Sequence, residues 1–174
     1  KYSIFLLPLK KLSNEIKENN WIKNVKLSTN YKDTIYINIE EYEPIGIYNF
    51  NKKFFYFDKT GNIIEELKKK LNYNKKLIFF SGKSSNLKAK SIIDILNYLN
   101  FQNNYKIERI IYIKKRRWDI ILRNNILLKL SENNPNISLQ NFINIEKTLS
   151  ETDMNNIKYF DLRNINKTLI SYIE

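Results

Sequence analysis

The first part of the chain changes from a helical to an alternating spacing of apolar residues. Along residues 9–16, apolar side chains recur every three or four positions, which predicts a helix that ends near Asn19. Residues 21–28 and 35–40 then alternate apolar with polar positions, as half-buried strands do. The polar residues 30–33 between them are typical of a hairpin connection. We therefore expect a helix followed by a two-stranded hairpin.

The middle of the chain combines short extended segments with a second helix. The spacing of apolar residues along 87–99 predicts an amphipathic helix. Gly61 and Gly82 each follow an apolar segment and mark its end, because glycine readily adopts the backbone of a tight turn. Residues 65–71 are charged and poorly periodic, and predict a loop or a short surface helix. Strands are predicted over residues 45–50, 54–57 and 77–83.

Alternation returns in the last part of the chain, with one helical interruption. Trp118, Ile120 and Leu122 share one side of a predicted strand, so we expect them in the core. Asn124–Asn125 stands where a hairpin turn would, because asparagine tolerates a left-handed backbone. A helix is predicted over residues 139–149, with Ser138 as its N-cap. Strands are predicted over residues 106–122, 126–130, 157–163 and 168–173.

The order of the predicted elements defines the fold class. A helix and a hairpin come first, followed by strands, a helix, several strands, a helix and two final strands. This order predicts an α+β protein in which helices pack on largely antiparallel sheets. No repeat of fixed period is visible in the sequence.

The composition supports a folded core but leaves the partner open. The chain has 174 residues, of which 43% are hydrophobic, so it can bury a core. Its formal net charge of +12 favours an anionic partner such as nucleic acid or a lipid surface. The cations are spread along the chain and most are lysine, while lysine, asparagine and isoleucine are frequent everywhere. A solvated, lysine-rich surface is therefore the simpler interpretation, and a basic nucleic-acid-binding domain is the alternative.

Cysteine and histidine are both absent, which excludes several kinds of site. No thiolate or imidazole metal site can form, and neither can a Cys–His or Ser–His nucleophile pair. The Gly-Lys-Ser of residues 82–84 lacks the glycine that a phosphate-binding loop needs five positions earlier, where Leu77 stands. We therefore expect no cofactor and no metal site. The enzyme interpretation that is left, a hydrolase that uses serine and lysine, is not favoured by the sequence.

Four consecutive cations, Lys114 to Arg117, form the strongest local concentration of charge. Three interpretations are open for this cluster. It grips phosphate, it ends an ordinary strand, or it meets an acidic protein partner.

The first predicted strand carries Trp21, Ile22 and Val25, and residues 41–44, at the end of the second, read Glu-Tyr-Glu-Pro. Together with the helix before them, these residues resemble the end of a POTRA module. In that family a helix leads into an aromatic-aliphatic strand, and a hairpin follows whose second strand ends in Glu-x-x-Pro. The resemblance implies that residues 1–49 are the C-terminal part of a truncated POTRA domain.

Four short motifs follow one another in the rest of the chain: FFYFDKTGNII, FFSGK ahead of a helix, RRWDIIL with ILLKL after a short turn, and Tyr-x-Asp-Leu-Arg at residues 159–163. In this order they resemble the second domain of the bacterial FtsQ/DivIB cell-division family. Three positions depart from the family pattern. The family usually has a glycine in place of Asn125, an aromatic residue in place of Asn164 and a second glycine in place of Lys167. The resemblance implies that residues 50–174 form an FtsQ-like β domain.

Membership of this family implies a non-catalytic scaffold of the division machinery. Such a protein binds FtsB- and FtsL-like proteins and, through them, the septal peptidoglycan synthase. The family also implies a single-pass inner-membrane protein at the division septum, with this part in the periplasm. The longest apolar run, residues 4–9, is far shorter than the ~20 residues that a membrane span needs, so we expect the span in an upstream segment.

The resemblance also implies how the partner docks. FtsB is expected to add a strand to the edge of the last C-terminal strand, so that main-chain hydrogen bonds join the two proteins. Acidic side chains of the partner then meet arginines of the RRW and DLR motifs. The partner-binding residues implied in this way are Arg116, Arg163, Asn164, Asn166, Lys167 and Thr168.

Some of these residues also have simpler interpretations. Arg116 shares strand parity with Trp118, so it must lie at a rim if it is to meet a partner. Arg163 follows Asp161 by two residues and is equally suited to an ion pair within its own chain. Lys167 in an edge strand can protect against aggregation as readily as it contacts a partner.

Overall fold

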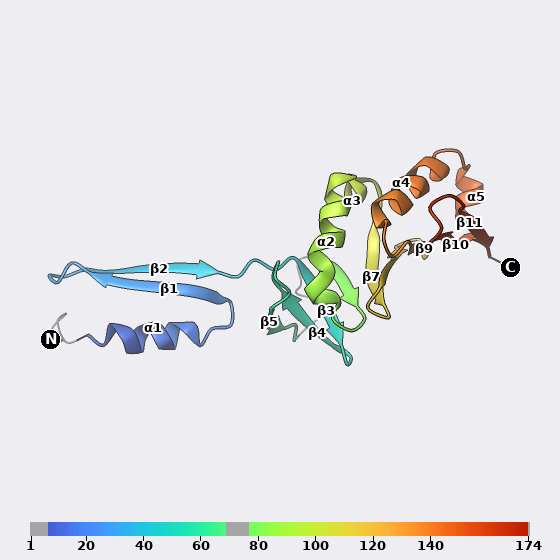
Figure 1. Ribbon diagram of the computed structural model, residues 1–174. Coiled ribbons are helices and arrows are strands. Elements are labelled where there is room, and N and C mark those ends of the chain that lie inside the picture. The colour runs from blue at the N-terminus through green and yellow to red at the C-terminus, as the bar shows by residue number, and fades with distance from the viewer. Residues whose placement is uncertain (1–6, 69–76, 174) are drawn as a thin grey trace. The chain divides into compact units, whose positions relative to one another are not determined.

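The computed structural model describes residues 7–68 and 77–173, which divide into two compact units (Figure 1). The first unit ends at Pro44 and the second begins at Ile45. Proline has no N–H group for strand pairing, which suits a break between units at this point. The expected boundary between residues 49 and 50 would cut through the first strand of the second unit, β3 (Gly46–Phe50).

The first unit consists of a helix and a hairpin, as the sequence predicts. Its elements are α1 (Leu9–Lys17), β1 (Ile22–Thr29) and β2 (Ile35–Glu41). The two strands pair antiparallel, and α1 contacts β1. Asn30 holds the hairpin turn, because its side-chain oxygen accepts hydrogen bonds from the backbone N–H groups of residues 32, 33 and 34 at 2.9 to 3.1 Å. This use of an asparagine side chain explains how the chain turns without glycine.

The second unit is a mixed sheet with helices packed on it. The order of its nine described strands is β11-β10-β9-β8-β7-β6-β3-β4-β5, and five of the eight neighbouring pairs are antiparallel. The predicted α+β class is confirmed. After β3, the elements are β4 (Lys53–Phe57), β5 (Ile63–Glu66), β6 (Ile78–Ser81), α2 (Ser85–Tyr98), α3 (Phe101–Asn104), β7 (Ile107–Ile113), β8 (Arg117–Leu122), β9 (Leu127–Leu130), α4 (Pro135–Glu146), α5 (Glu151–Asn155), β10 (Ile157–Leu162) and β11 (Leu169–Tyr172).

Two of the expected local assignments are wrong. Residues 65–66 belong to β5 and not to a loop or helix, because they pair with β4; residues 69–71 of that prediction lie outside the described residues. Ser138 does not cap α4, since the helix already begins at Pro135, with Asn134 as its N-cap. Proline favours the first helical turn, where its missing N–H group is not needed. The structure also adds the short helices α3 and α5, which span too few residues to give a periodic signal.

One row of apolar side chains crosses the sheet and forms the centre of the core. The register of seven strands aligns these residues side by side, and α2 and α4 cover them with Ile92, Leu96 and Phe142. Trp118 packs against Phe80, with ring centroids 6.0 Å apart, so its predicted place in the core is confirmed. The aligned residues are Tyr48, Phe80, Ile110, Ile120, Leu128, Phe160 and Ile170.

The described helices of the second unit lie on one face of its sheet (Figure 1). The opposite face, which we call the helix-free face, carries the side chains of alternate parity. The parallel strands β3, β6 and β7 run in the same direction, and so do β9 and β10. The connections that follow these strands therefore emerge at the same end of the sheet, the end at which these strands finish. This arrangement positions the surfaces described below.

Gly82 makes the tight connection between β6 and α2. Its φ of +98° is a conformation that side-chain-bearing residues rarely adopt, and a Cβ atom there would lie 2.2 Å from the carbonyl oxygen of Tyr112. The backbone of this connection therefore passes directly against β7, in a space that holds no side chain. The predicted end of the strand at Gly82 is confirmed.

We expect Gly82→Ala to destabilise the second unit by more than about 2 kcal/mol, because the new methyl group meets backbone atoms and the positive φ is strained. Chemical denaturation of the purified chain measures this effect. Lys83→Ala, at the exposed neighbouring position, is the control and should change the free energy of unfolding by less than about 0.5 kcal/mol. An equal effect of the two variants would contradict this account of Gly82.

Candidate functional site

β11 is an edge strand with exposed apolar side chains. In the described sheet it pairs with β10 on one side and has no strand on the other. Leu169, Tyr172 and the following Ile173 are all more than half exposed, whereas Ile170 points into the core. Unpaired backbone groups beside exposed apolar side chains make an edge that can accept a further strand.

A hollow of about 370 Å³ opens beside the start of this edge strand. We call it the β10–β11 hollow, and it is lined by Asp161, Arg163, Asn164, Lys167 and Leu169. Three of these residues, Arg163, Asn164 and Lys167, are among the six implied by the sequence. The hollow thus combines cations, an amide and an apolar side chain that is 53% exposed.

Two side chains of α4 position the loop between β10 and β11. The Ser138 hydroxyl donates to the carbonyl oxygen of Leu162 at 2.8 Å and accepts from the N–H group of Ser131 at 3.0 Å. Asn141 donates from its side-chain amide to the carbonyl oxygen of Ile165 at 2.8 Å. Because Ser138 is fully buried, both of its hydrogen bonds are shielded from water. The residue expected to cap the helix therefore connects α4 to the ends of β9 and β10.

Arg163 forms a forked ion pair with Asp161. Its Nε and Nη2 atoms donate to the Asp161 carboxylate at 2.8 and 2.6 Å, so the internal pair that the sequence left open is present. The hydrogen bonds from Arg163 hold the pKa of Asp161 below its usual value, although partial burial opposes them. The Arg163 side chain is still 54% exposed, so its guanidinium faces the hollow already oriented by its partner.

The ion pair belongs to a charged row on the helix-free face. The register places Asp119 opposite Lys129 and Lys129 opposite Asp161, while Arg117 pairs with Asp119 at 3.1 Å. Lys129 also lies over the ring of Tyr159, 3.6 Å from its centroid. Oppositely charged neighbours across a sheet stabilise one another. The sequence reasoning missed this row, although the parity of Arg117 and Asp119 along β8 was the available signal.

The other implied residues lie outside the hollow. Arg116 is in the β7–β8 turn, with its Nε atom 3.7 Å from the Glu132 carboxylate and its side chain largely exposed. Arg116 therefore lies at the end of the sheet and not within it, as it must if it is to meet a partner. Asn166 donates its backbone N–H to the side-chain oxygen of Asn164 at 3.0 Å, and Thr168 is half-buried just before β11. Leu169, which the sequence did not single out, is the apolar wall of the hollow.

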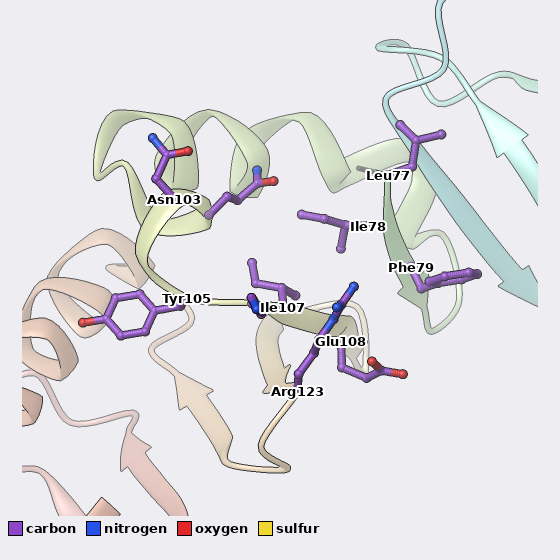
Figure 2. A pocket seen from close by; sticks show the side chains of 10 residues that line it. Leu77, Ile78, Phe79, Asn103, Tyr105, Ile107, Glu108 and Arg123 are labelled. Atoms are coloured by element: carbon purple, nitrogen blue, oxygen red, sulfur yellow. The ribbon is translucent and has the colours of Figure 1, made fainter. Parts of the chain in front are cut away.

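A larger cavity, of about 550 Å³, lies at the amino ends of β6 and β7 (Figure 2). Leu77, Ile78 and Phe79 line one wall, and the Arg123 side chain extends toward them beside Ile107 (Figure 2). None of the six implied residues lines this cavity. It is therefore separate from the β10–β11 hollow.

Residues 7–68 and 77–173 contain no cluster of three or more acidic side chains that could hold a metal ion. Over the same ranges, no helix is long and apolar enough to cross a membrane. What the β10–β11 hollow offers chemically is recognition: free strand backbone, an oriented guanidinium and exposed apolar side chains.

The ion pair predicts a pH dependence of stability. Because the pKa of Asp161 is lower in the folded than in the unfolded chain, its ionised form stabilises the fold above about pH 4, and this contribution is lost as the pH falls through the folded-state value. We expect Asp161→Asn to lower the free energy of unfolding by about 1 kcal/mol at pH 7 and by much less at pH 3. Denaturant titrations at the two pH values measure the difference.

Asp94→Asn is the control for this experiment, because Asp94 pairs with Lys90 on the exposed surface of α2. Its effect should stay below about 0.5 kcal/mol at pH 7. If Asp161→Asn shifted stability equally at both pH values, the ionised pair would not be the source of the stabilisation.

Comparison with known families agrees with the two units. The family model "Cell division protein FtsQ/DivIB, C-terminal" matches residues 46–163, and the model "POTRA domain, FtsQ-type" matches residues 1–42. The second unit and the helix-hairpin unit are therefore each similar to a domain of the same family.

Curated relatives give the same result over nearly the whole chain. The chain is 32% identical to the cell division protein FtsQ of Rickettsia felis over 168 residues, which is 96% of this chain and 61% of the relative. It is 33% identical to that of Rickettsia bellii over 168 residues, with 97% and 61% covered, and 28% identical to that of Bartonella bacilliformis over 159 residues, with 90% and 49% covered. The chain thus spans about three-fifths of the length of the two Rickettsia relatives. It belongs to the FtsQ/DivIB family of bacterial cell-division proteins.

Proposed function

We propose that this chain is a non-catalytic scaffold of the division machinery that binds FtsB- and FtsL-like proteins and links them to septal peptidoglycan synthesis. The observation that carries the proposal is the open edge of β11 beside the β10–β11 hollow. An enzyme would need a set of reactive groups held together, whereas this surface offers the elements of protein recognition.

The partner docks by strand addition. A segment of the FtsB-like protein lies along β11 and continues the sheet, so that its backbone pairs with the free side of that strand. Main-chain hydrogen bonds give affinity in such a complex, and side-chain contacts select the partner. Leu169 and Tyr172 supply the exposed apolar contacts along this edge.

Arg163 supplies the electrostatic selection. Its fork with Asp161 fixes the direction of the guanidinium, so that little side-chain freedom is lost when an acidic partner residue binds. Asn164, Asn166, Lys167 and Thr168 flank the same edge and complete the contact. Arg116 acts from the exposed β7–β8 turn, where its long contact with Glu132 leaves the guanidinium available to a second acidic residue.

The proposal also covers the cellular location of the protein. It is a single-pass inner-membrane protein at the division septum, anchored by an upstream segment, with both units in the periplasm. The first unit then forms the C-terminal part of a POTRA domain, and the second unit forms the FtsQ-like β domain.

Charge reversal at Arg163 tests the electrostatic contact. We expect Arg163→Glu to weaken binding of the FtsB-like protein of the same organism at least about tenfold, because an attraction becomes a repulsion. Isothermal titration of the purified proteins measures the affinity, and circular dichroism checks that the variant is folded. Arg123→Glu is the control, because it makes the same charge change just after β8, at the end of the sheet opposite to Arg163. It should leave affinity within about twofold. If both variants bind like the unaltered chain, Arg163 is not in the interface.

A substitution in the edge strand tests the docking mode. Leu169→Asp places a charge on the apolar wall of the hollow, and we expect affinity to fall at least about tenfold while stability changes little, since Leu169 is exposed. Leu87→Asp, at a similarly exposed position on α2, is the matched control and should bind normally. Equal binding by the two variants would place the partner elsewhere than on β11.

A further inference from the structure

A second surface lies at the ends of the central strands, where three connections meet. The register aligns Asn49 of β3, Ser81 of β6 and Ile111 of β7 in one row. The β3–β4 turn, the β6–α2 connection and the β7–β8 turn therefore emerge side by side, and Figure 1 shows the tips of both hairpins at the same end of the sheet. We call this surface the basic rim, and it comprises Phe50, Lys52, Lys83, Lys114 and Lys115.

All four lysines of the basic rim are exposed. Neighbouring cations outside the rim have partners, since Lys53 lies 3.1 Å from Glu66 and Arg116 contacts Glu132. Over the described residues, by contrast, no carboxylate lies within ion-pairing distance of Lys52, Lys83, Lys114 or Lys115. The rim therefore presents four uncompensated positive charges from three connections.

The backbone of the two turns does not favour the lysines that occupy them. Asn51, Lys52, Lys114 and Lys115 all have positive φ, between 48° and 64°. Asparagine and glycine adopt this conformation more readily than lysine, and asparagine is frequent in this chain. Three of the four positions are nevertheless lysine, so the two turns carry positive charge at positions where asparagine would suit the backbone better.

Two ring contacts connect the basic rim to buried side chains, and the rim includes an exposed aromatic side chain. The hydroxyl of Tyr112 donates to the carbonyl oxygen of Lys115 at 2.9 Å, and its ring lies 4.4 Å from that of Trp118, which fixes the β7–β8 turn on the core. Phe50 is 48% exposed and stacks on the buried Tyr48, with centroids 5.8 Å apart. The β7–β8 turn and Phe50 are therefore both anchored to buried side chains.

We infer that the basic rim binds the surface of an anionic lipid bilayer. Lysine is a mobile point charge that suits a diffuse anionic surface, whereas selective recognition of single carboxylates or phosphates favours the arginine fork. Several lysines beside an exposed phenylalanine combine attraction to charged headgroups with insertion of an apolar ring at the boundary of the acyl chains. This contact uses lysines and an aromatic ring, whereas the proposed docking edge at β11 uses arginine and apolar strand residues. Arg116, which is proposed to meet the protein partner, lies in the same turn as Lys114 and Lys115.

Vesicle co-sedimentation of the purified 174-residue chain tests the inference. The probes are vesicles of phosphatidylglycerol and phosphatidylcholine in equal parts, and vesicles of phosphatidylcholine alone. We expect binding to the first and none to the second. Lys114→Asn/Lys115→Asn should lower the partition onto the anionic vesicles about 30-fold, because each lysine near such a surface contributes about fivefold. Asparagine suits the left-handed backbone, so this variant keeps the fold.

Lys147→Asn/Lys158→Asn is the matched control. These exposed lysines lie at the ends of α4 and β10 that are remote from the rim, and their removal lowers the net charge by the same amount. An equal loss of binding in both double variants would show a general effect of net charge and overturn the inference. So would a lack of binding to anionic vesicles, or binding of DNA fragments that depends on Lys114 and Lys115 while vesicle binding does not.

The aromatic contribution is tested separately. Phe50→Ser should weaken binding to the anionic vesicles about tenfold, whereas Tyr98→Ser, at an aromatic residue that is 85% exposed on the remote end of α2, should not change it. Unchanged binding of Phe50→Ser would show that the phenylalanine ring does not contribute to the contact with the bilayer.

Discussion

The second unit is organised around one continuous row of buried side chains that crosses seven strands. Phe80, Ile110, Ile120, Leu128 and Phe160 are fully buried and lie side by side beneath α2 and α4. Side chains alternate between the faces of a strand, so a slip of one residue in any strand would move its members of the row to the other face. Burial of this row therefore fixes the register of the sheet. Every other surface of the unit follows from that register.

The charged row and the basic rim are two consequences of the same alignment. Asp119, Lys129 and Asp161 come together because they have the opposite parity to the buried residues of their strands. Strands that are aligned by the core also end together, so the connections after β3, β6 and β7 emerge at the same end of the sheet. The first alignment produces carboxylates and cations that neutralise each other. The second gathers lysines for which the described residues offer no carboxylate partner, and this difference separates a structural network from a surface that is available to an anion.

The β10–β11 hollow depends on a few buried polar contacts in addition to the core. Ser138 bonds to backbone groups at the ends of β9 and β10, and Asn141 bonds to the loop that follows β10. A buried hydroxyl or backbone group without a partner is destabilising, so these contacts define where β10 ends and where Arg163 points. The arginine is then oriented by Asp161 before any partner arrives. Membership of the FtsQ/DivIB family and the geometry of this edge thus lead to the same proposal for its role.

The sequence alone determined the local elements whose spacing is strong. The helix at residues 9–16, the hairpin after it, the strand end at Gly82 and the core position of Trp118 all follow from periodicity and backbone preference. The motifs around Trp118 and Asp161 also carried the family resemblance. These features depend on residues that are close together in the chain, so they are visible before any folding is considered.

Only the tertiary structure decided which residues meet. Lys129 joins Asp119 to Asp161, Ser138 acts between two strands instead of capping its helix, and Leu169 becomes the wall of a hollow. β9 and β10 are parallel neighbours separated by two helices in sequence, and no local pattern specifies that pairing. The strand order is selected by burial of side chains contributed by the whole unit. For that reason the composition of the hollow and of the basic rim emerges only when the sheet is assembled.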